Sequence, residues 1–390
     1  MSSMKALVGA RIFDGVKWHQ NKALLIDSGQ VSELIDRGAI PEGAETVEAG
    51  GLVIVPGFID LQVNGGGGVM FNNQSDVEAI ARICAAHAKF GTTALMVTLI
   101  TDRPDVTMKA ADAGIAAWND GVPGFLGLHF EGPHLSIARK GTHDPALIRP
   151  MEEADLTTLT TCKAKLPHIL TTIAPESVTT EQVVDLRHAG IVVSLGHTEA
   201  GFAVAECYVD AGASMVTHLF NAMSPLGHRE PGLVGAALAN GKLDCGLIAD
   251  GFHVDAAAMG IALRAKNGPG RIFLVTDAMS TIGTDDDGFE LNGRRVYRNG
   301  GRLTLADGTL AGADIDMLSC IRFVHENLQV PLEEALRMAS TYPAQAIGAN
   351  DKGSLQPGFD ADFVLLTPSL DIHSTWIGGN KIFDANNSGK

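Results

Sequence analysis

The stretch of residues 191–223, IVVSLGHTEAGFAVAECYVDAGASMVTHLFNAM, decides the fold because it holds one strand-helix-strand unit with a histidine after each strand. The first apolar, β-branched run leads to His197, and the second leads to His218. Residues 199–212 between them have helical apolar spacing, with apolar positions that include Phe202, Val204 and Cys207. Parallel strands joined by a crossover helix end at the same rim of a sheet, so the two histidines can converge on one ion.

The composition limits the class of protein. The chain has 390 residues, 45% of them apolar, and 45 glycines, which fits one large domain with an appendage or two domains. A net charge of −16 and a pI near 5.2 argue against a general nucleic-acid or anionic-membrane surface. The five cysteines are scattered without a CxxC spacing, as expected in a reducing compartment. With no secretory signal and no long apolar run, we expect a soluble, cytoplasmic protein.

Strand and helix patterns alternate through the middle of the chain. Eight candidate strands span residues 57–63, 92–100, 125–130, 169–173, 191–195, 214–219, 245–249 and 272–275. Helical patterns lie between them, and two more follow near 314–327 and 332–346. Eight such units predict an α/β fold, a (β/α)8 TIM-type barrel with its active site at the carboxyl ends of the strands. A doubly wound open sheet is the alternative, but no GxGxxG opens a first helix.

Short strand patterns also occur at both ends of the chain, in residues 1–54 and 353–390. Because neither end can bury much surface alone, we expect the two to pair into one small β domain beside a barrel of residues 55–352. Three turn signals near 285–312 predict a hairpin insertion within the barrel.

Chemically active side chains follow several of the predicted strands. Glu131, His197 and His218 supply the carboxylate and two imidazoles that hold zinc while leaving a position open for water. Asp277, after the last strand, suits a general base that takes a proton from that water. Each residue alone also has a structural explanation, such as a helix cap or an ion pair, but four on one rim favour a catalytic centre.

The remaining histidines divide by position. His129 lies two residues before Glu131 and points the same way, so we expect it to support the metal ligands without binding the metal. The histidines expected to be structural or on the surface are His19, His87, His168, His188, His325 and His373.

Seven motifs give the chain a family resemblance. In chain order they are PGFIDLQVNG, LGLHFEGPHL, KGTHDP, SLGHTEA, VTHLFNAM, DGFHVD and VTDAM. Together they resemble the N-acetylglucosamine-6-phosphate deacetylase family of the amidohydrolase superfamily, from Pro56 to Asp362. The resemblance implies a metal-dependent barrel with a small β sandwich built from both termini. It also implies hydrolysis of N-acetyl-D-glucosamine 6-phosphate to D-glucosamine 6-phosphate and acetate, in amino-sugar catabolism.

The resemblance implies roles for individual residues. Glu131, His197 and His218 would bind the metal, and Asp277 would act as general base and then acid. His143 would bind and polarise the acetyl carbonyl. The phosphate would bind the backbone N–H groups of Asn221 and Ala222, His253, and Arg229 from the neighbouring subunit, which implies a homodimer.

Two positions depart from the wider pattern. Many amidohydrolases carry HxH after the first strand and hold two metals, whereas this chain has Gln62 and Asn64. We therefore expect one divalent metal ion per subunit, with zinc favoured and iron, cobalt or manganese as alternatives. His134 stands where the family more often has an aromatic residue, and we expect it to be a pocket wall rather than an extra ligand.

Three alternative functions compete with this one. An N-acetylgalactosamine-6-phosphate deacetylase would share the metal, the base and the phosphate site, so the sequence separates the two epimers poorly. A cyclic-amide hydrolase of the dihydroorotase kind would need the missing HxH pair. A non-catalytic scaffold would need none of Glu131, His197, His218 and Asp277.

Overall fold

The computed structural model describes residues 4–387 and contains the predicted barrel. Eight parallel strands lie in chain order around it: β8 (Phe58–Val63), β11 (Thr92–Ile100), β12 (Phe125–Glu131), β13 (Ile169–Ile173), β14 (Val192–Leu195), β15 (Met215–Val216), β16 (Asp244–Ile248) and β17 (Ile272–Val275). The N–H of Asp277, just after β17, donates to the carbonyl of Gln62 in β8 at 3.0 Å, which joins the last strand to the first. The fold prediction is confirmed.

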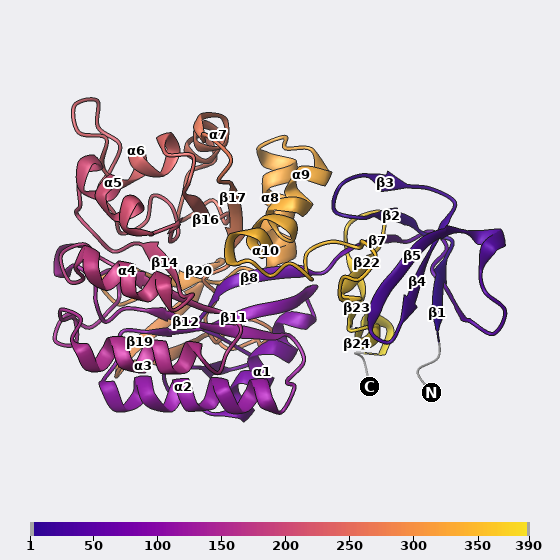
Figure 1. Ribbon diagram of the computed structural model, residues 1–390, viewed down its shortest axis with the longest axis horizontal. Coiled ribbons are helices and arrows are strands. Elements are labelled where there is room, and N and C mark those ends of the chain that lie inside the picture. Colours follow the sequence, from indigo (N-terminus) through magenta and orange to yellow (C-terminus); the bar gives the residue numbers. More distant parts are fainter. Residues whose placement is uncertain (1–3, 388–390) are drawn as a thin grey trace.

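Helices cover the outside of the barrel (Figure 1). The first seven are α1 (Val77–Ala88), α2 (Pro104–Asn119), α3 (Glu153–Lys163), α4 (Thr180–His188), α5 (Phe202–Ala211), α6 (Gly232–Ala239) and α7 (Ala256–Ala265). Because the strands are covered on both faces, polar and apolar residues alike are buried along them, and every residue of β8, β11 and β13 is buried. Side-chain caps set several helix starts: Asp76 accepts the N–H of Ala79 in α1, and Thr179 and Gln182 form a capping box at α4.

Helix α5 buries a face that its apolar spacing alone does not identify. Its buried residues are Ala205, Tyr208 and Val209, whereas Val204 is 43% exposed and Cys207 is also exposed. The Tyr208 hydroxyl donates to backbone carbonyls of the loop before α4, which fixes this rotation of the helix. Spacing alone fits either face, because the helix is apolar on more than one side.

The predicted helix 332–346 is two helices. The chain forms α8 (Met317–Asn327), then α9 (Leu332–Met338) and α10 (Thr341–Ile347). Pro343 is the reason for the break, because a proline inside one continuous helix would clash with the carbonyl of Ala339, four residues earlier. In the first turn of α10 the proline is tolerated, since no N–H is required there.

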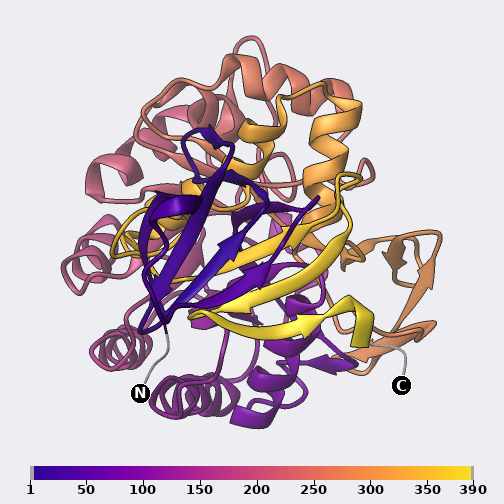
Figure 2. The ribbon, with the colours of Figure 1, turned by 90° about the vertical axis from the view of Figure 1, so that its right-hand side faces the viewer.

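The two ends of the chain meet in a small domain of two sheets beside the barrel (Figures 1 and 2). One sheet has the order β5-β4-β1-β6 and the other β24-β23-β22-β7-β2-β3. The strands are β1 (Lys5–Val8), β2 (Arg11–Phe13), β3 (Trp18–His19), β4 (Lys22–Asp27), β5 (Gln30–Asp36), β6 (Glu45–Glu48), β7 (Val53–Pro56), β22 (Phe363–Leu366), β23 (Ile372–Ile377) and β24 (Asn380–Asp384). Antiparallel pairing of β7 with β22 joins the two ends.

Between β17 and α8 the chain makes an antiparallel sheet of four strands, which we name the insertion sheet. Its strands are β18 (Gly288–Leu291), β19 (Arg294–Asn299), β20 (Arg302–Thr304) and β21 (Leu310–Ala313). A second, two-stranded hairpin of β9 (Gly65–Gly66) and β10 (Val69–Met70) follows β8. Within residues 4–387, no helix has both the length and the apolar character needed to cross a membrane.

Candidate active site

The candidate catalytic residues lie where barrel strands end. Glu131 is the last residue of β12, and His197, His218 and Asp277 each follow the end of a strand by two residues. The last three have positive φ angles of 48°, 30° and 51°. Residues other than glycine rarely adopt this conformation, and it is concentrated at functional sites. Here it turns the backbone away from the strand direction at the rim of the barrel.

Three ligand atoms meet in a small triangle. Glu131 Oε1 lies 3.2 Å from His197 Nε2 and 3.1 Å from His218 Nε2, and the two nitrogens are 3.0 Å apart. The three side chains are buried. In a tetrahedral site with bonds of about 2.0 to 2.1 Å, ligand atoms would be about 3.3 to 3.4 Å apart. The observed triangle therefore fits a zinc-sized ion after small outward movements.

The tautomer of His197 also fits a metal ligand. Its Nδ1 lies 2.8 Å from the carbonyl of Arg139, and because a carbonyl can only accept, Nδ1 carries the proton. Nε2 then presents a lone pair to the triangle, which is the arrangement that orients most metal-binding histidines. Burial would raise the pKa of Glu131, but the close rings of His197 and His218 outweigh it and hold that pKa well below its usual value.

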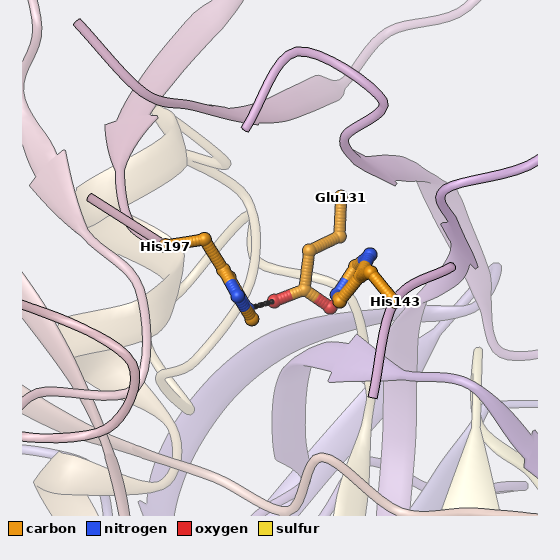
Figure 3. A group of neighbouring side chains, drawn as sticks. All are labelled: Glu131, His143 and His197. Atoms are coloured by element: carbon orange, nitrogen blue, oxygen red, sulfur yellow. Dashed lines mark hydrogen bonds and ion pairs between the residues drawn. The ribbon is translucent and has the colours of Figure 1, made fainter. Parts of the chain in front are cut away.

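His143 stands next to the triangle. Figure 3 shows the Glu131 carboxylate lying between His197 and His143, and one ligand atom from each of the three lies within 4.8 Å of the others. This wider group is an alternative ligand set, but the closer spacing with His218 favours the triangle. Burial, and then the neighbouring His197, lower the pKa of His143 to about 3, so the ring is neutral. Its Nδ1 lies 2.7 Å from the Thr101 hydroxyl and accepts the Thr101 N–H at 3.4 Å.

The side-chain amides of Gln62 and Asn64 hold Asp277 in place. The sequence indicated only that these two residues are poor metal ligands. Asn64 Nδ2 donates to Asp277 Oδ1 at 2.6 Å, and Gln62 Nε2 donates to the same oxygen at 3.1 Å and to Glu131 Oε1 at 3.2 Å. Removal from bulk water, and then repulsion from Glu131, raise the pKa of Asp277 to about 6. The alternation of Asp60 and Gln62 in β8 with Asn64 just after it could have indicated that both amides face the barrel interior.

A cavity of about 240 Å³ connects these residues to the predicted phosphate end. Its lining runs from Glu131, His143 and Asp277 to Asn221, Ala222 and His253. His253 Nδ1 lies 2.6 Å from Asp250 Oδ2, so its Nε2 is the nitrogen left for a ligand. The structure thus brings the metal, acetyl and phosphate residues predicted from one chain around a single cavity.

Three residues named in the sequence analysis do not simply present a free group to this cavity. Arg229 is exposed in the loop before α6 and does not line the cavity of its own chain. The backbone N–H of Asn221 donates to the carbonyl of His218 at 2.9 Å, so a phosphate at this position would have to share that donor. His134 is a wall of a cavity, but of a separate one beside α3, and its Nδ1 lies 3.1 Å from the Arg149 carbonyl.

His129 sits one layer deeper in the barrel. Its ring nitrogens lie 3.1 Å from the Thr98 hydroxyl and 2.8 Å from the Thr172 hydroxyl. The Thr172 hydroxyl is in turn 2.7 Å from that of Thr217, the residue before His218. His129 therefore lies in the strand that ends at Glu131, and a chain of two threonine hydroxyls connects its ring to the residue before His218.

Comparison with known proteins places this site in context. Residues 53–382 match the amidohydrolase family. The chain is 43% identical over 332 residues to an N-acetylgalactosamine-6-phosphate deacetylase of Shewanella sp. (strain ANA-3), covering 85% of this chain and 84% of that protein. It is 35% identical over 379 residues to an N-acetylglucosamine-6-phosphate deacetylase of Haemophilus influenzae, covering 96% and 98%.

Solved structures agree with these similarities. An N-acetylglucosamine-6-phosphate deacetylase from Pasteurella multocida superposes with a TM-score of 0.93 at 34% identity, covering 97% of this chain and 99% of that one. The Mycobacterium smegmatis enzyme, solved as a mutant in complex with N-acetyl-D-glucosamine 6-phosphate, superposes with a TM-score of 0.90 at 31% identity, with the same coverage.

Proposed function

Because the chain belongs to the amidohydrolase family, we propose that it hydrolyses the N-acetyl group of N-acetyl-D-glucosamine 6-phosphate, releasing D-glucosamine 6-phosphate and acetate. The observation that carries the proposal is the triangle of Glu131, His197 and His218, which shares one cavity with Asp277. Both rings approach the Glu131 carboxylate to within 3.2 Å, and a cation at this point would neutralise that buried carboxylate.

Glu131, His197 and His218 would hold one divalent metal ion per chain, with zinc favoured by two imidazoles and one carboxylate. Such an ion lowers the pKa of water to near neutrality and polarises a carbonyl oxygen. Gln62 and Asn64 use their amide N–H groups on Glu131 and Asp277, which supports a single metal.

Asp277 would move the proton. Its Oδ1 is occupied by the amides of Asn64 and Gln62, so Oδ2 is the oxygen free to take a proton from the attacking water. The same oxygen would then deliver that proton to the departing amine nitrogen of the sugar. A pKa near 6 suits both steps at neutral pH, because the group is ionised before the reaction and can still be protonated during it.

His143 would polarise the acetyl carbonyl. The Thr101 N–H donates to His143 Nδ1, so this nitrogen is an acceptor and Nε2 carries the hydrogen. A neutral imidazole with its N–H directed into the cavity can donate to the acetyl oxygen as negative charge develops there. This donor strengthens as the carbonyl is attacked, which is the requirement for lowering the barrier.

The phosphate would bind at the other end of the cavity, to the Ala222 N–H, to His253 and to Arg229 of a second copy of the chain. Ala222 and His253 line the cavity, and the exposed position of Arg229 fits a residue that acts on a neighbouring subunit. We therefore propose a homodimer. Asn221 would contribute only if its N–H were shared between the His218 carbonyl and the phosphate.

We divide the chain into a catalytic barrel of residues 55–352, with its insertion near 285–312, and a small domain of residues 1–54 and 353–390.

We also propose that the enzyme is located in the cytoplasm. All five cysteines are free thiols, as expected in a reducing compartment.

The galactosamine epimer is the second candidate substrate. Its support is specific: the Shewanella relative named for that epimer is 43% identical to this chain, compared with 35% for the Haemophilus relative named for the glucosamine epimer. The two substrates differ only in the orientation of one hydroxyl, so the same metal, base and phosphate residues would serve both.

The test is acetate release from both N-acetylhexosamine 6-phosphates and from both unphosphorylated sugars. We expect hydrolysis of a phosphorylated sugar and a kcat/KM at least about 100-fold lower without the phosphate, because a lost charged contact is worth several kcal/mol. The better phosphorylated epimer identifies the substrate. No release from either would exclude the proposed function.

A further inference from the structure

The insertion sheet contacts the active site at two points that lie far apart in the sequence. We propose that it braces the catalytic pair of Asp277 and His143, and that Arg294 in β19 is the positioning residue for His143. This inference rests on the function proposed above, because it assigns a role in polarising the acetyl carbonyl. In Figure 2 the orange strands of the sheet project from the side of the barrel.

The first point of contact is the backbone of Asp277. The N–H of Ala313, the last residue of β21, donates to the Asp277 carbonyl at 2.9 Å, and the N–H of Met279 donates to the Ala313 carbonyl at 3.3 Å. Gly312 permits this close approach: its φ is +64°, and a Cβ there would lie 2.6 Å from Met279 and 2.9 Å from the Asp277 carbonyl. One end of the sheet thus fixes the strained backbone that carries the proposed base.

The second point of contact is the loop that carries His143. The Arg294 guanidinium donates to the carbonyl of Thr142, the residue before His143. The His143 N–H donates to the carbonyl of Lys140 at 3.0 Å, so Arg294 completes a short, closed turn. Arg294 is half-buried, whereas its neighbour Arg295 is exposed on the other face of the strand and pairs with Asp287 at 2.6 Å.

An apolar cluster links these two points of contact. It joins Met70, Ile100 and Met279 of the barrel rim to Phe289, Leu291, Val296, Leu303 and Ala311 of the insertion sheet. Ile100 precedes Thr101, which is hydrogen-bonded to His143, and Met279 lies two residues after Asp277. Packing of the sheet therefore restrains both catalytic side chains through their immediate neighbours.

The sheet also forms part of the cavity itself. Thr309, Leu310 and Gly312 line the cavity together with Gly141, Thr142 and His143. A shift of β21 would consequently change both the shape of the cavity and the position of Asp277. Arg294 is the contact that can be removed without touching the cavity, because it acts on a backbone carbonyl from outside.

The experiment compares Arg294→Met with Arg295→Met on two substrates, the N-acetyl and N-trifluoroacetyl forms of the preferred hexosamine 6-phosphate. Trifluoroacetyl is already electron-poor and needs less polarisation. For Arg294→Met we expect kcat on the acetyl substrate to fall about 10- to 100-fold, as for a misplaced catalytic group. On the trifluoroacetyl substrate we expect less than about a threefold fall, because the carbonyl donor matters less there. Arg295→Met should stay within about twofold on both, as for an exposed ion pair.

A merely structural role for Arg294 predicts equal losses on the two substrates, and that result would overturn the inference. Arg294→Lys keeps the positive charge and part of the side-chain length, so it should retain more activity on the acetyl substrate than Arg294→Met does. It also serves as the test variant if Arg294→Met does not fold. In a double mutant with His143→Gln, the Arg294 change should add no further loss, since both act through one imidazole. Independent, multiplicative losses would also overturn it.

Failure of the inference can be told apart from failure of the proposed function. If the wild-type enzyme releases acetate from neither phosphorylated epimer, the proposed function is wrong. If the wild type is active and Arg294→Met matches it on both substrates, only the bracing role is wrong. Metal content and melting temperature of each variant, measured in parallel, establish that the folded, loaded enzyme is being compared.

Discussion

Asn64 donates its side-chain amide to Asp277 across 2.6 Å, and this contact is shorter than the 3.1 Å hydrogen bond that Gln62 donates to the same oxygen. The bond lowers the pKa of Asp277 against the larger effect of its removal from water. A general base must be ionised, so activity should be present above this pKa and lost as the pH falls through it. In the loaded enzyme the positive metal lowers the value further, which places the acid limb at or below about 6.

Replacing Asn64 with Ala should move the acid limb of kcat/KM upward by about one pH unit, the equivalent of about 1.4 kcal/mol for one charge-assisted hydrogen bond. The pH profile measures this directly. Asn267→Ala is a matched control, because the Asn267 amide bonds to the Ala239 carbonyl at an exposed site away from the cavity. A limb that stays in place, or moves to lower pH, would contradict the assigned contact.

Asp277→Asn keeps the shape of the side chain and removes its ability to accept a proton. We expect kcat to fall by about 10² to 10⁴, the usual contribution of general acid-base catalysis. The metal content should remain unchanged, since none of the three triangle atoms belongs to Asp277. Steady-state kinetics with elemental analysis of the same sample tests both parts, and unchanged turnover would remove Asp277 from the mechanism.

Chelation of the metal should abolish activity and lower the melting temperature. The triangle holds two imidazoles and a carboxylate in close contact, and an ion that binds only the folded state stabilises it by about 4 kcal/mol at a 1,000-fold excess over its Kd. We expect about one metal per chain and recovery on adding zinc. Glu131→Gln should lose the response to zinc. Two metals per chain would show that Gln62 and Asn64 do not prevent a second site.

Gly127→Ala tests the packing of β12 four residues before Glu131. A Cβ at Gly127 would lie 2.2 Å from the His168 carbonyl oxygen, so the strand or its neighbour must shift. We expect the free energy of unfolding to fall by about 1 to 3 kcal/mol, the range for overpacked interiors. Gly38→Ala is the control, because nothing lies within 4 Å of its added Cβ. Denaturant unfolding of both variants gives the comparison, and equal stabilities would contradict the packing argument.

The sequence predicted what depends on local pattern. Strand length, apolar continuity and the residue after each strand are encoded over a few neighbouring positions, so the barrel and the rim residues Glu131, His197, His218 and Asp277 could all be placed in advance. A parallel barrel converts position along a strand into position in space, since every strand ends at the same rim.

Contacts between distant segments could not be predicted in this way. Arg294 and Thr142 are 152 residues apart, and no period or motif relates them. The N–H of Asn221 bonds to His218 because the loop turns through several left-handed residues, which a propensity argument does not anticipate. The break between α9 and α10, in contrast, could have been predicted from the sequence. Pro343 would clash with the preceding turn of a continuous helix, and this clash outweighs the apolar spacing.

The pairing of β7 with β22 has a consequence for synthesis. The ribosome synthesises Val53–Pro56 long before Phe363–Leu366. The edge of β7 that pairs with β22 therefore stays unpaired while all the barrel strands are synthesised. During that interval the buried side chains Ile54 and Val55 are without their final cover. The small domain can therefore be completed only late in folding. Until β22 has been synthesised, the nascent chain exposes the unpaired edge of β7, which could pair with other chains.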